Sequence, residues 1–252
     1  MSDSTPTAGA DPVQVARSTA RAIGGVPSNF MLDAATYVAA AEAGYAGMDF
    51  YFAGRAGALG DVDAAAVVSE LGVFPEPAVV AAWEATADLE SRSAAAQRFA
   101  DQAARWAGEH LDPDALDYDR LAELARQVLE AADLGDAAMV AGWLELDEPE
   151  AAPARALHRL NGLRELRFAR HRDELGAADV APLDAVMVAS PFMAGIFGWP
   201  EPHPEPDEAT RQAWSAAEAA TDERFARDLE VLTPQELAEF ADLCDGLVSA
   251  VR

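Results

Sequence analysis

Three potentially cationic side chains, Arg164, Arg167 and His171, are spaced three or four residues apart within residues 157–175, LHRLNGLRELRFARHRDEL. A helix turns by about 100° per residue, so this segment read as a helix places them on one otherwise apolar face. That face comprises Leu157, Leu160, Arg164, Arg167, Phe168, His171 and Leu175. Burying a cation is costly unless a partner compensates its charge. The partner here is either a carboxylate of this chain or a bound ligand.

A further cation, Arg55, ends an aromatic stretch earlier in the chain, and two roles are open for the four basic groups. In the first, Arg55, Arg164 and Arg167 line a cavity and bind a carboxylate, phosphate or phenolate. His171 is then the candidate catalytic acid–base group. In the second, the cations form internal ion pairs that fix helix packing. Candidate acids for such pairs are Glu42, Asp49 and Glu165.

The pattern of residues 30–57 predicts one long helix with an aromatic face. Met48, Tyr51 and Phe52 on that face are candidate ligand-binding residues, because an aromatic stripe can line a pocket for a flat ligand. The same spacing is typical of plain core packing. The whole predicted face comprises Tyr37, Ala41, Gly44, Tyr45, Met48, Tyr51, Phe52 and Arg55.

No metal site and no cofactor can be assigned from the sequence. The four histidines are dispersed, and the chain contains no HExxH motif and no EF-hand loop. The single cysteine, Cys244, excludes an internal disulfide and a cysteine-based metal cluster, and we expect it to fill the core. GxGxxG after a strand, the P-loop and GxSxG are also missing, so nucleotide-dependent chemistry and serine hydrolysis are unsupported.

The net charge of −26 restricts the possible partners. Every basic residue is arginine, and such an acidic surface repels DNA, which argues against nucleic acid as a partner. No apolar run could span a bilayer and no signal peptide follows the start, so we expect a cytoplasmic protein without a membrane partner. The expected partner is a small organic ligand, and the oligomeric state stays open.

Helical periodicity recurs along the chain and nothing indicates a confident strand. The predicted fold class is therefore all-α and multi-helical, with little or no β-structure. The composition suggests a disordered N-terminus followed by two helical halves, a stiff proline-rich linker and C-terminal helices. The corresponding ranges are 1–12, 13–146, 147–199, 200–207 and 208–252.

Two predicted helices, 63–71 and 76–87, have the spacing of a helix-turn-helix. The second contains several carboxylates and no basic residue, which fits the major groove poorly. The alternative interpretation is a helical packing unit with Trp83 in the core.

Two blocks of the sequence resemble the actinobacterial SalK-like family, named after a member from a polyether antibiotic gene cluster. They are YFAGRAGALGDVDAAAVVSELGVFPEPAVVAAW, residues 51–83, and LRELRFARHRDELGAADVAPLDAVMV, residues 163–188. The second block matches the family pattern LREHRGxGHxxAL at Arg164, Glu165, Arg167 and His171, and departs from the family at Leu166, Phe168, Arg170 and Asp184.

The resemblance implies a mostly helical fold related to MarR-type winged-helix regulators, as two degenerate repeats. It also implies a connection with specialised metabolism. The sequence differs most from the family after Val188. There the linker 200–207 replaces much of the second winged-helix portion that the family usually has. We favour a small-molecule-binding protein with an interior cavity for an anionic or aromatic ligand. The alternatives are a cofactor-independent tailoring enzyme that uses His171, with Tyr51, for proton transfer, and a ligand-responsive DNA-binding regulator.

Overall fold

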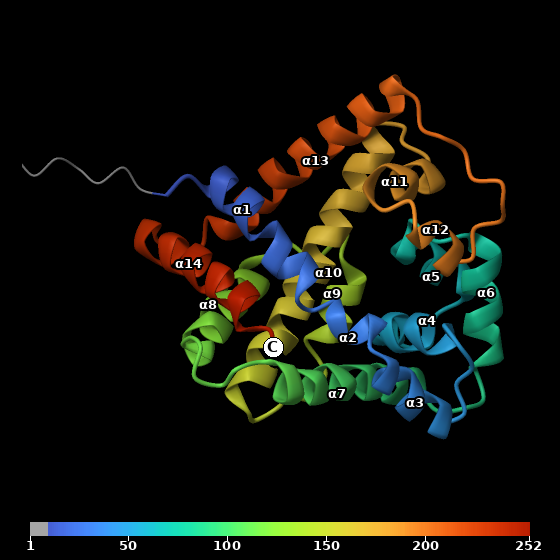
Figure 1. Ribbon diagram of the computed structural model, residues 1–252, viewed down its shortest axis with the longest axis horizontal. Helices are drawn as coiled ribbons and strands as arrows, with labels where there is room; N and C mark the ends of the chain where they lie inside the picture. Colours follow the sequence, from blue (N-terminus) through green and yellow to red (C-terminus); the bar gives the residue numbers. More distant parts are fainter. Residues whose placement is uncertain (1–9) are drawn as a thin grey trace, which may run out of the picture.

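The computed structural model describes residues 10–252, and helices make up its regular structure throughout that range (Figure 1). The only β-type pairing among these residues is an isolated antiparallel bridge between Leu111 and Val251. The all-α prediction is therefore confirmed. The predicted disordered N-terminus falls mostly on residues 1–9, which lie outside the described part, and the first helix begins at Pro12.

The first part of the chain consists of short helices followed by one long one. They are α1 (Pro12–Gly25), α2 (Asn29–Leu32), α3 (Ala34–Glu42), α4 (Asp49–Ala56), the 3₁₀ turn η1 (Gly57–Leu59), α5 (Ala64–Leu71), α6 (Glu76–Ala85) and α7 (Arg92–His110). The rest comprises α8 (Tyr118–Ala131), α9 (Ala138–Trp143), α10 (Ala152–Ala177), α11 (Pro182–Ala189), α12 (Met193–Ile196), α13 (Glu208–Leu229) and α14 (Pro234–Ala250).

Short polar side chains explain where many of these helices begin, because the first backbone N–H groups of a helix lack partners inside it. Thr233 and Glu236 form a complete capping box at the start of α14. The other helices with a side-chain cap are capped by Asp11, Asp33, Asp63, Ser91, Asp117 and Asp207.

The single long helix predicted for residues 30–57 is wrong. Asp33 has an extended backbone and caps a new helix, α3, by accepting a hydrogen bond from the backbone of Ala35. Gly44 and Gly47 then adopt positive φ values of 94° and 47°, which glycine tolerates far better than other residues. The predicted aromatic face is therefore divided among α3, α4 and the glycine loop between them, which holds Tyr45 and Met48.

Helix α10 is the central element of the fold. It packs against α1, α7, α8, α9 and α13 and runs through the middle of the molecule (Figure 1). Leu157, Leu160, Leu163 and Leu166 are all fully buried although they point in different directions around the helix. Helix α10 is thus covered on several sides, and polar groups on it must find partners within the protein.

Past the centre of the molecule, α10 continues toward α11 and α12, and residues 200–207 lead back to α13 (Figure 1). A small second core of Leu175, Val180, Ala185 and Ala217 joins the ends of α10, α11 and α13. The first, larger core draws its buried residues from α1 to α10 and from α13 and α14. The division of the chain into two halves at residue 147 stays a prediction.

Candidate functional site

Arg55 is held by a buried ion pair. Its Nε and Nη2 atoms donate to Oε1 and Oε2 of Glu165 at 2.8 and 2.7 Å, and both side chains are at most 5% exposed. Its Nη1 atom donates to the Tyr51 hydroxyl at 3.0 Å, and the guanidinium lies 4.6 Å from the ring centre of Phe168. Every face of this cation therefore has a partner inside the protein.

Arg164 and Arg167 also form ion pairs, although Nε of Arg167 is buried without a hydrogen-bond partner in the described residues. Arg164 lies 2.5 Å from Glu165, while Nη2 of Arg167 lies 2.9 Å from Asp222 and 3.2 Å from Glu218. Burial alone would raise the pKa of Glu165, but the charges and hydrogen bonds of Arg55 and Arg164 hold it below its ordinary value. The three arginines predicted to bind an anion thus already have carboxylate partners.

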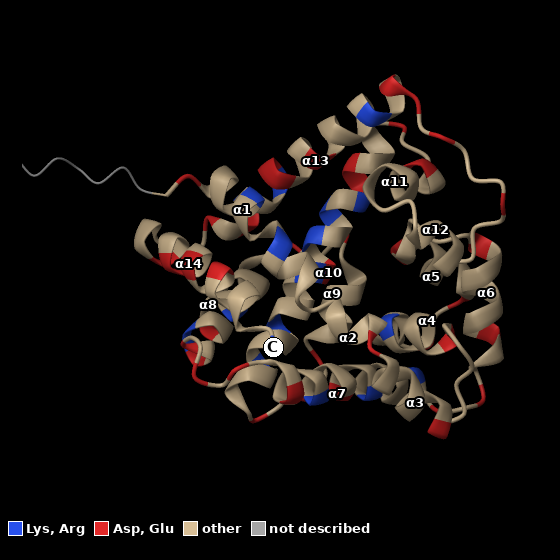
Figure 2. Cartoon of the chain, viewed as in Figure 1, with Lys and Arg blue, Asp and Glu red and all other residues tan. Residues whose placement is uncertain are grey.

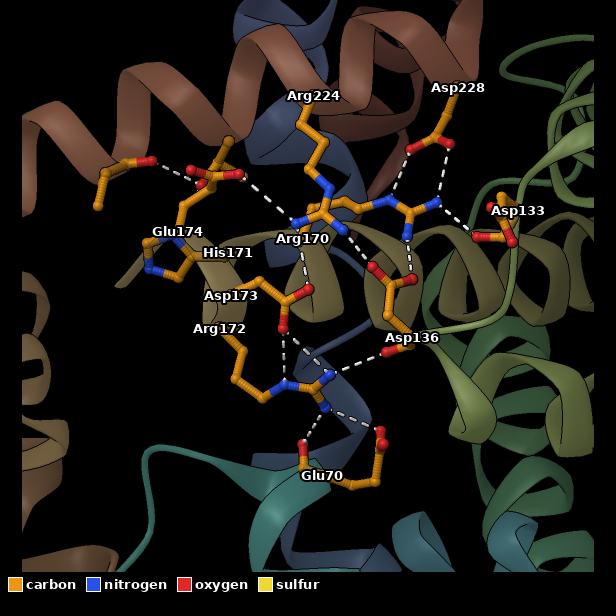
Figure 3. A network of polar contacts seen from close by, with 12 residues as sticks. Glu70, Asp133, Asp136, Arg170, His171, Arg172, Asp173, Glu174, Arg224 and Asp228 are labelled. Carbon is orange, nitrogen blue, oxygen red and sulfur yellow. Dashed lines mark hydrogen bonds and ion pairs between the residues drawn. The ribbon is translucent and has the colours of Figure 1, made fainter. Parts of the chain in front are cut away.

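A second set of ion pairs fastens α10 to its neighbours (Figure 3). Arg170, 4% exposed, forms a two-pronged pair with Asp228 of α13 at 3.1 and 3.0 Å and also contacts Asp136. Arg172 pairs with Glu70 of α5 at 2.9 Å. Sequence reasoning missed this network, because its acids come from segments far from α10 in the sequence.

A pocket of about 190 Å³ adjoins His171. Helices α10, α11, α12 and α13 surround it together with the segment before α6. Most of its lining is apolar, and the polar members are His171, Ser190 and Trp214. The lining residues are Val73, His171, Ala185, Val186, Ala189, Ser190, Met193, Phe197 and Trp214.

The surroundings of His171 fix which of its ring nitrogens carries the proton. Its Nδ1 atom lies 3.0 Å from Oγ1 of Thr221 and 3.3 Å from Oε1 of Glu218. The Thr221 hydroxyl donates its single hydrogen to the carbonyl of Ala217 at 2.7 Å. Both neighbours of Nδ1 must therefore accept, so Nδ1 is the donor. In neutral His171, Nε2 is then an acceptor, and it makes no hydrogen bond within residues 10–252.

The protonation of His171 follows from its burial. Desolvation lowers the pKa of the ring, and the positive charge of Arg167 acts in the same direction. Glu218 and Asp222 oppose this shift, but the pKa stays below its ordinary value. Neutral His171 is thus the form favoured at pH 7.

Trp214 also lines this pocket. Its indole Nε1 is buried and has no hydrogen-bond partner in the described residues. Its ring stands edge-on to His171, with ring centres 6.5 Å apart and an angle of 82°. Sequence reasoning missed Trp214, because a single tryptophan in an acid-rich helix carries no signal of a site.

The predicted aromatic residues lie elsewhere. Tyr51 and Phe52 are 6% and 4% exposed, and their rings pack edge-to-face with centres 5.6 Å apart. Met48 is half-buried, and its Sδ atom lies 3.5 Å from the Tyr37 hydroxyl. None of the three lines the pocket beside His171. Arg164 and Arg167 instead border another pocket, of about 210 Å³, with Ser28 and Phe168.

Two larger hollows, of about 580 and 590 Å³, lie at the Arg170–Asp228 network and between α5 and α9. Neither is lined by a buried polar side-chain atom that lacks a partner. Within residues 10–252, no group of three or more His, Cys, Asp or Glu side chains could hold a metal ion. No helix of the same range is long and apolar enough to cross a membrane.

Comparison with known proteins places the chain among helix-turn-helix proteins. A family model described as a helix-turn-helix family matches residues 16–252. Comparison with curated proteins and with solved structures gives no significant match.

Proposed function

The chain belongs to a helix-turn-helix family, and we propose that it binds a small organic molecule in the pocket beside His171. The observation that carries this proposal is a largely apolar pocket with His171 in its lining, a ring whose Nε2 makes no hydrogen bond within residues 10–252. Apolar walls favour burial of an apolar ligand, and one polar group among them can orient it.

The size of the pocket suits a molecule with a single ring. Engineered apolar cavities of about 150 Å³ bind benzene, and this pocket measures about 190 Å³. Its apolar walls supply the burial that drives binding of such a ligand.

The charges of the site favour an uncharged ligand over the anionic one that the arginines suggest. Arg167 is paired with Glu218 and Asp222, and Glu218 also contacts His171. An anion in this pocket would find no arginine among the lining residues, and the acid Glu218 lies on the other side of the His171 ring, at Nδ1. Of the two predicted ligand classes, we therefore propose the aromatic or apolar one.

The test uses toluene as a probe of the pocket, followed through the indole N–H signals of ¹⁵N-labelled protein. Toluene should shift the Trp214 signal, assigned with a Trp214→Phe variant. Trp83, Trp143 and Trp199 already donate to backbone carbonyls and serve as internal references. Ala189→Trp fills the pocket and should abolish the shift.

The matched control is Ala209→Trp, which adds the same side chain at an exposed position of α13 outside the pocket lining. Toluene should shift the Trp214 signal in this control as in the parent protein. No response of Trp214 to saturating toluene in the parent protein would overturn the proposal.

DNA binding is the second candidate, favoured by the family alone. Helices α5 and α6 have helix-turn-helix spacing, yet residues 61–87 include no basic residue, and α6 exposes Glu76 and Glu84 (Figure 2). Arginine and lysine provide most phosphate contacts and the commonest base contacts. We therefore expect no binding of duplex DNA at 50 mM salt in a fluorescence anisotropy titration. Salt-sensitive binding at low micromolar protein would restore the regulator hypothesis.

The resemblance to SalK-like proteins supports a more specific setting, the cytoplasm of an actinobacterium and a role in specialised metabolism. Catalysis by His171 in a tailoring reaction would be an extension of ligand binding, with neutral Nε2 as the proton acceptor. Both statements are proposals that depend on the resemblance and on occupancy of the pocket.

A further inference from the structure

An apolar groove of about 590 Å³, which we call the α5–α9 groove, lies between α5 and α9. Ala138 and Ala141 in its lining are exposed, so the groove opens to the surface along α9. Alanine side chains are short and let a second helix approach closely, and the axes of packed helices lie about 8–10 Å apart. The apolar lining consists of Ala58, Leu59, Val62, Ala66, Ala138 and Ala141.

The walls of the groove belong to two separately packed parts of the fold. Helix α5 packs against α4 and α6, while α9 packs against η1 and α10. A Cβ on Gly142 would lie 1.6 Å from the carbonyl oxygen of Ala58, so α9 and η1 are in direct backbone contact within the lining. The walls are therefore preformed, which lowers the ordering cost of binding.

The charges around the α5–α9 groove have one sign. Every lining residue comes from residues 56–91 or 127–154, and these two segments contain no arginine, lysine or histidine. The lining includes the acids Glu70 and Glu145. Arg172 of α10 pairs with Glu70, whereas Glu145 is exposed and forms no ion pair in the described part of the chain. The groove thus combines apolar walls with acidic surroundings.

We propose that the α5–α9 groove binds an amphipathic helix of a partner protein, with apolar side chains on one face and arginine or lysine beside them. Helix-in-groove recognition places the apolar face of such a helix against apolar walls. Basic residues at its flanks complement the unpaired Glu145 and speed the encounter. None of the groove residues lines the pocket beside His171, so this binding does not depend on the small-molecule function.

Other occupants suit the groove less well. A second copy of this chain would bring its own acidic segments against these, and like charges repel. Duplex DNA meets the same repulsion through its phosphates. A small molecule would find no buried, unpartnered polar side-chain atom in the described lining to orient it.

The test uses a fluorescein-labelled peptide of leucine and lysine, about 18 residues or five helical turns long, whose leucines share one helical face. Its affinity is measured by fluorescence anisotropy at physiological salt. A scrambled peptide of the same composition keeps the charge but lacks the apolar face, and it should bind at least about 10-fold more weakly. A peptide with glutamate in place of lysine keeps the apolar face and should also bind more weakly, because its charge matches that of the rim.

The indole signal of Trp83 locates the bound peptide in ¹⁵N-labelled protein. Nε1 of Trp83 donates to the carbonyl oxygen of Val62, a lining residue, at 3.1 Å. Occupancy of the groove should therefore shift this signal. The signal of Trp214, which lines the pocket beside His171, should stay unchanged.

Two pairs of variants assign the contact to the groove. Ala141→Trp fills it and should weaken the leucine–lysine peptide at least about 10-fold, whereas Ala209→Trp, at an exposed position of α13, should bind like the parent protein. Glu145→Gln should weaken binding by about 2- to 5-fold. Glu150→Gln removes an equally exposed charge outside the lining and should have a smaller effect.

Equal binding of the leucine–lysine peptide and its scrambled form to the parent protein would reduce the contact to charge alone and overturn the proposal. Parent-like affinity of Ala141→Trp, or no anisotropy change at the highest soluble protein concentration, would also overturn it. A dimer of the parent protein that Ala141→Trp dissociates would assign the groove to a second copy instead. The peptide comparison needs no variant, so it decides the matter even if Ala141→Trp fails to fold.

Discussion

Replacing Glu165 with glutamine should destabilise the protein more than replacing Arg55 with methionine, although the two residues form one ion pair. Glu165 accepts from both Arg55 and Arg164, so its loss leaves two cations without a carboxylate. Arg55, 2% exposed, cannot reach water instead. In the Arg55→Met variant, Glu165 still forms its ion pair with Arg164, whose side chain is 15% exposed, so the carboxylate is not left without a partner.

Removing one member of a buried pair costs about 3–5 kcal/mol, because the other charge stays buried without compensation. We expect a loss in this range for Glu165→Gln, and a smaller loss of about 1–3 kcal/mol for Arg55→Met. For a chain of this length, the larger loss corresponds to a fall in Tm of roughly 6–20 °C. The double variant Arg55→Met, Glu165→Met removes both charges and should be more stable than Glu165→Gln alone.

Urea unfolding followed by circular dichroism at pH 7 measures these losses. The pKa of Glu165 is below its ordinary value of 4.5, so its contribution is complete above that pH and is lost as the pH falls through the lower, folded-state value. Glu165→Gln should therefore lose less stability than the parent protein on acidification. A loss under about 1 kcal/mol for Glu165→Gln, or a larger loss for Arg55→Met, would refute the argument.

Two further predictions concern single positions. A Cβ on Gly142 of α9 would lie 1.6 Å from the carbonyl oxygen of Ala58, so Gly142→Ala should cost more than about 2 kcal/mol in urea unfolding. Gly108→Ala in α7, where no atom lies within 4 Å of the added group, should instead stabilise the protein by about 0.5–1 kcal/mol. Equal effects of the two substitutions on the free energy of unfolding would contradict the close contact between α9 and Ala58. Burial lowers the pKa of His158 to about 4 from its ordinary value of 6.5. The unfolded chain therefore binds the proton more tightly, and stability falls by up to about 3 kcal/mol as the pH drops from 6.5 to 4. His158→Phe keeps the stacking on Trp143 and should reduce this loss between pH 7 and pH 5, and an unchanged loss would count against a buried neutral ring.

Sequence patterns predict helices best where caps and periodicity agree. Ser91 caps α7 and Thr233 caps α14, and serine and threonine are among the residues that favour the first position of a helix. The segment 30–57 shows the limit of periodicity. Its apolar residues keep helical spacing across Gly44 and Gly47, but the backbone turns at these two glycines. The segment therefore forms two separate helices, α3 and α4, which periodicity alone does not predict.

The candidate site was predictable only in part. The sequence identifies His171 and the inward arginines of α10, because polar residues on an apolar helical face are conspicuous. It cannot tell which acids meet them, since Asp222 and Glu218 belong to α13 and lie over fifty residues away from Arg167. It also gives no indication that Trp214 lines the pocket beside His171, because that depends on how α10 and α13 pack.

The excess of acid also explains why the proposed ligand is uncharged. Acidic residues number 44 against 18 basic ones, so an arginine that points inward meets a carboxylate from some other segment. All the arginines of α10 are paired, and only Arg164 has its partner, Glu165, on α10 itself; the others are Arg155, Arg159, Arg167, Arg170 and Arg172. An anionic ligand would have to displace one of these carboxylates and leave it buried without a partner. The residues that line the pocket beside His171 include no arginine, so an uncharged ligand suits this pocket better than an anionic one.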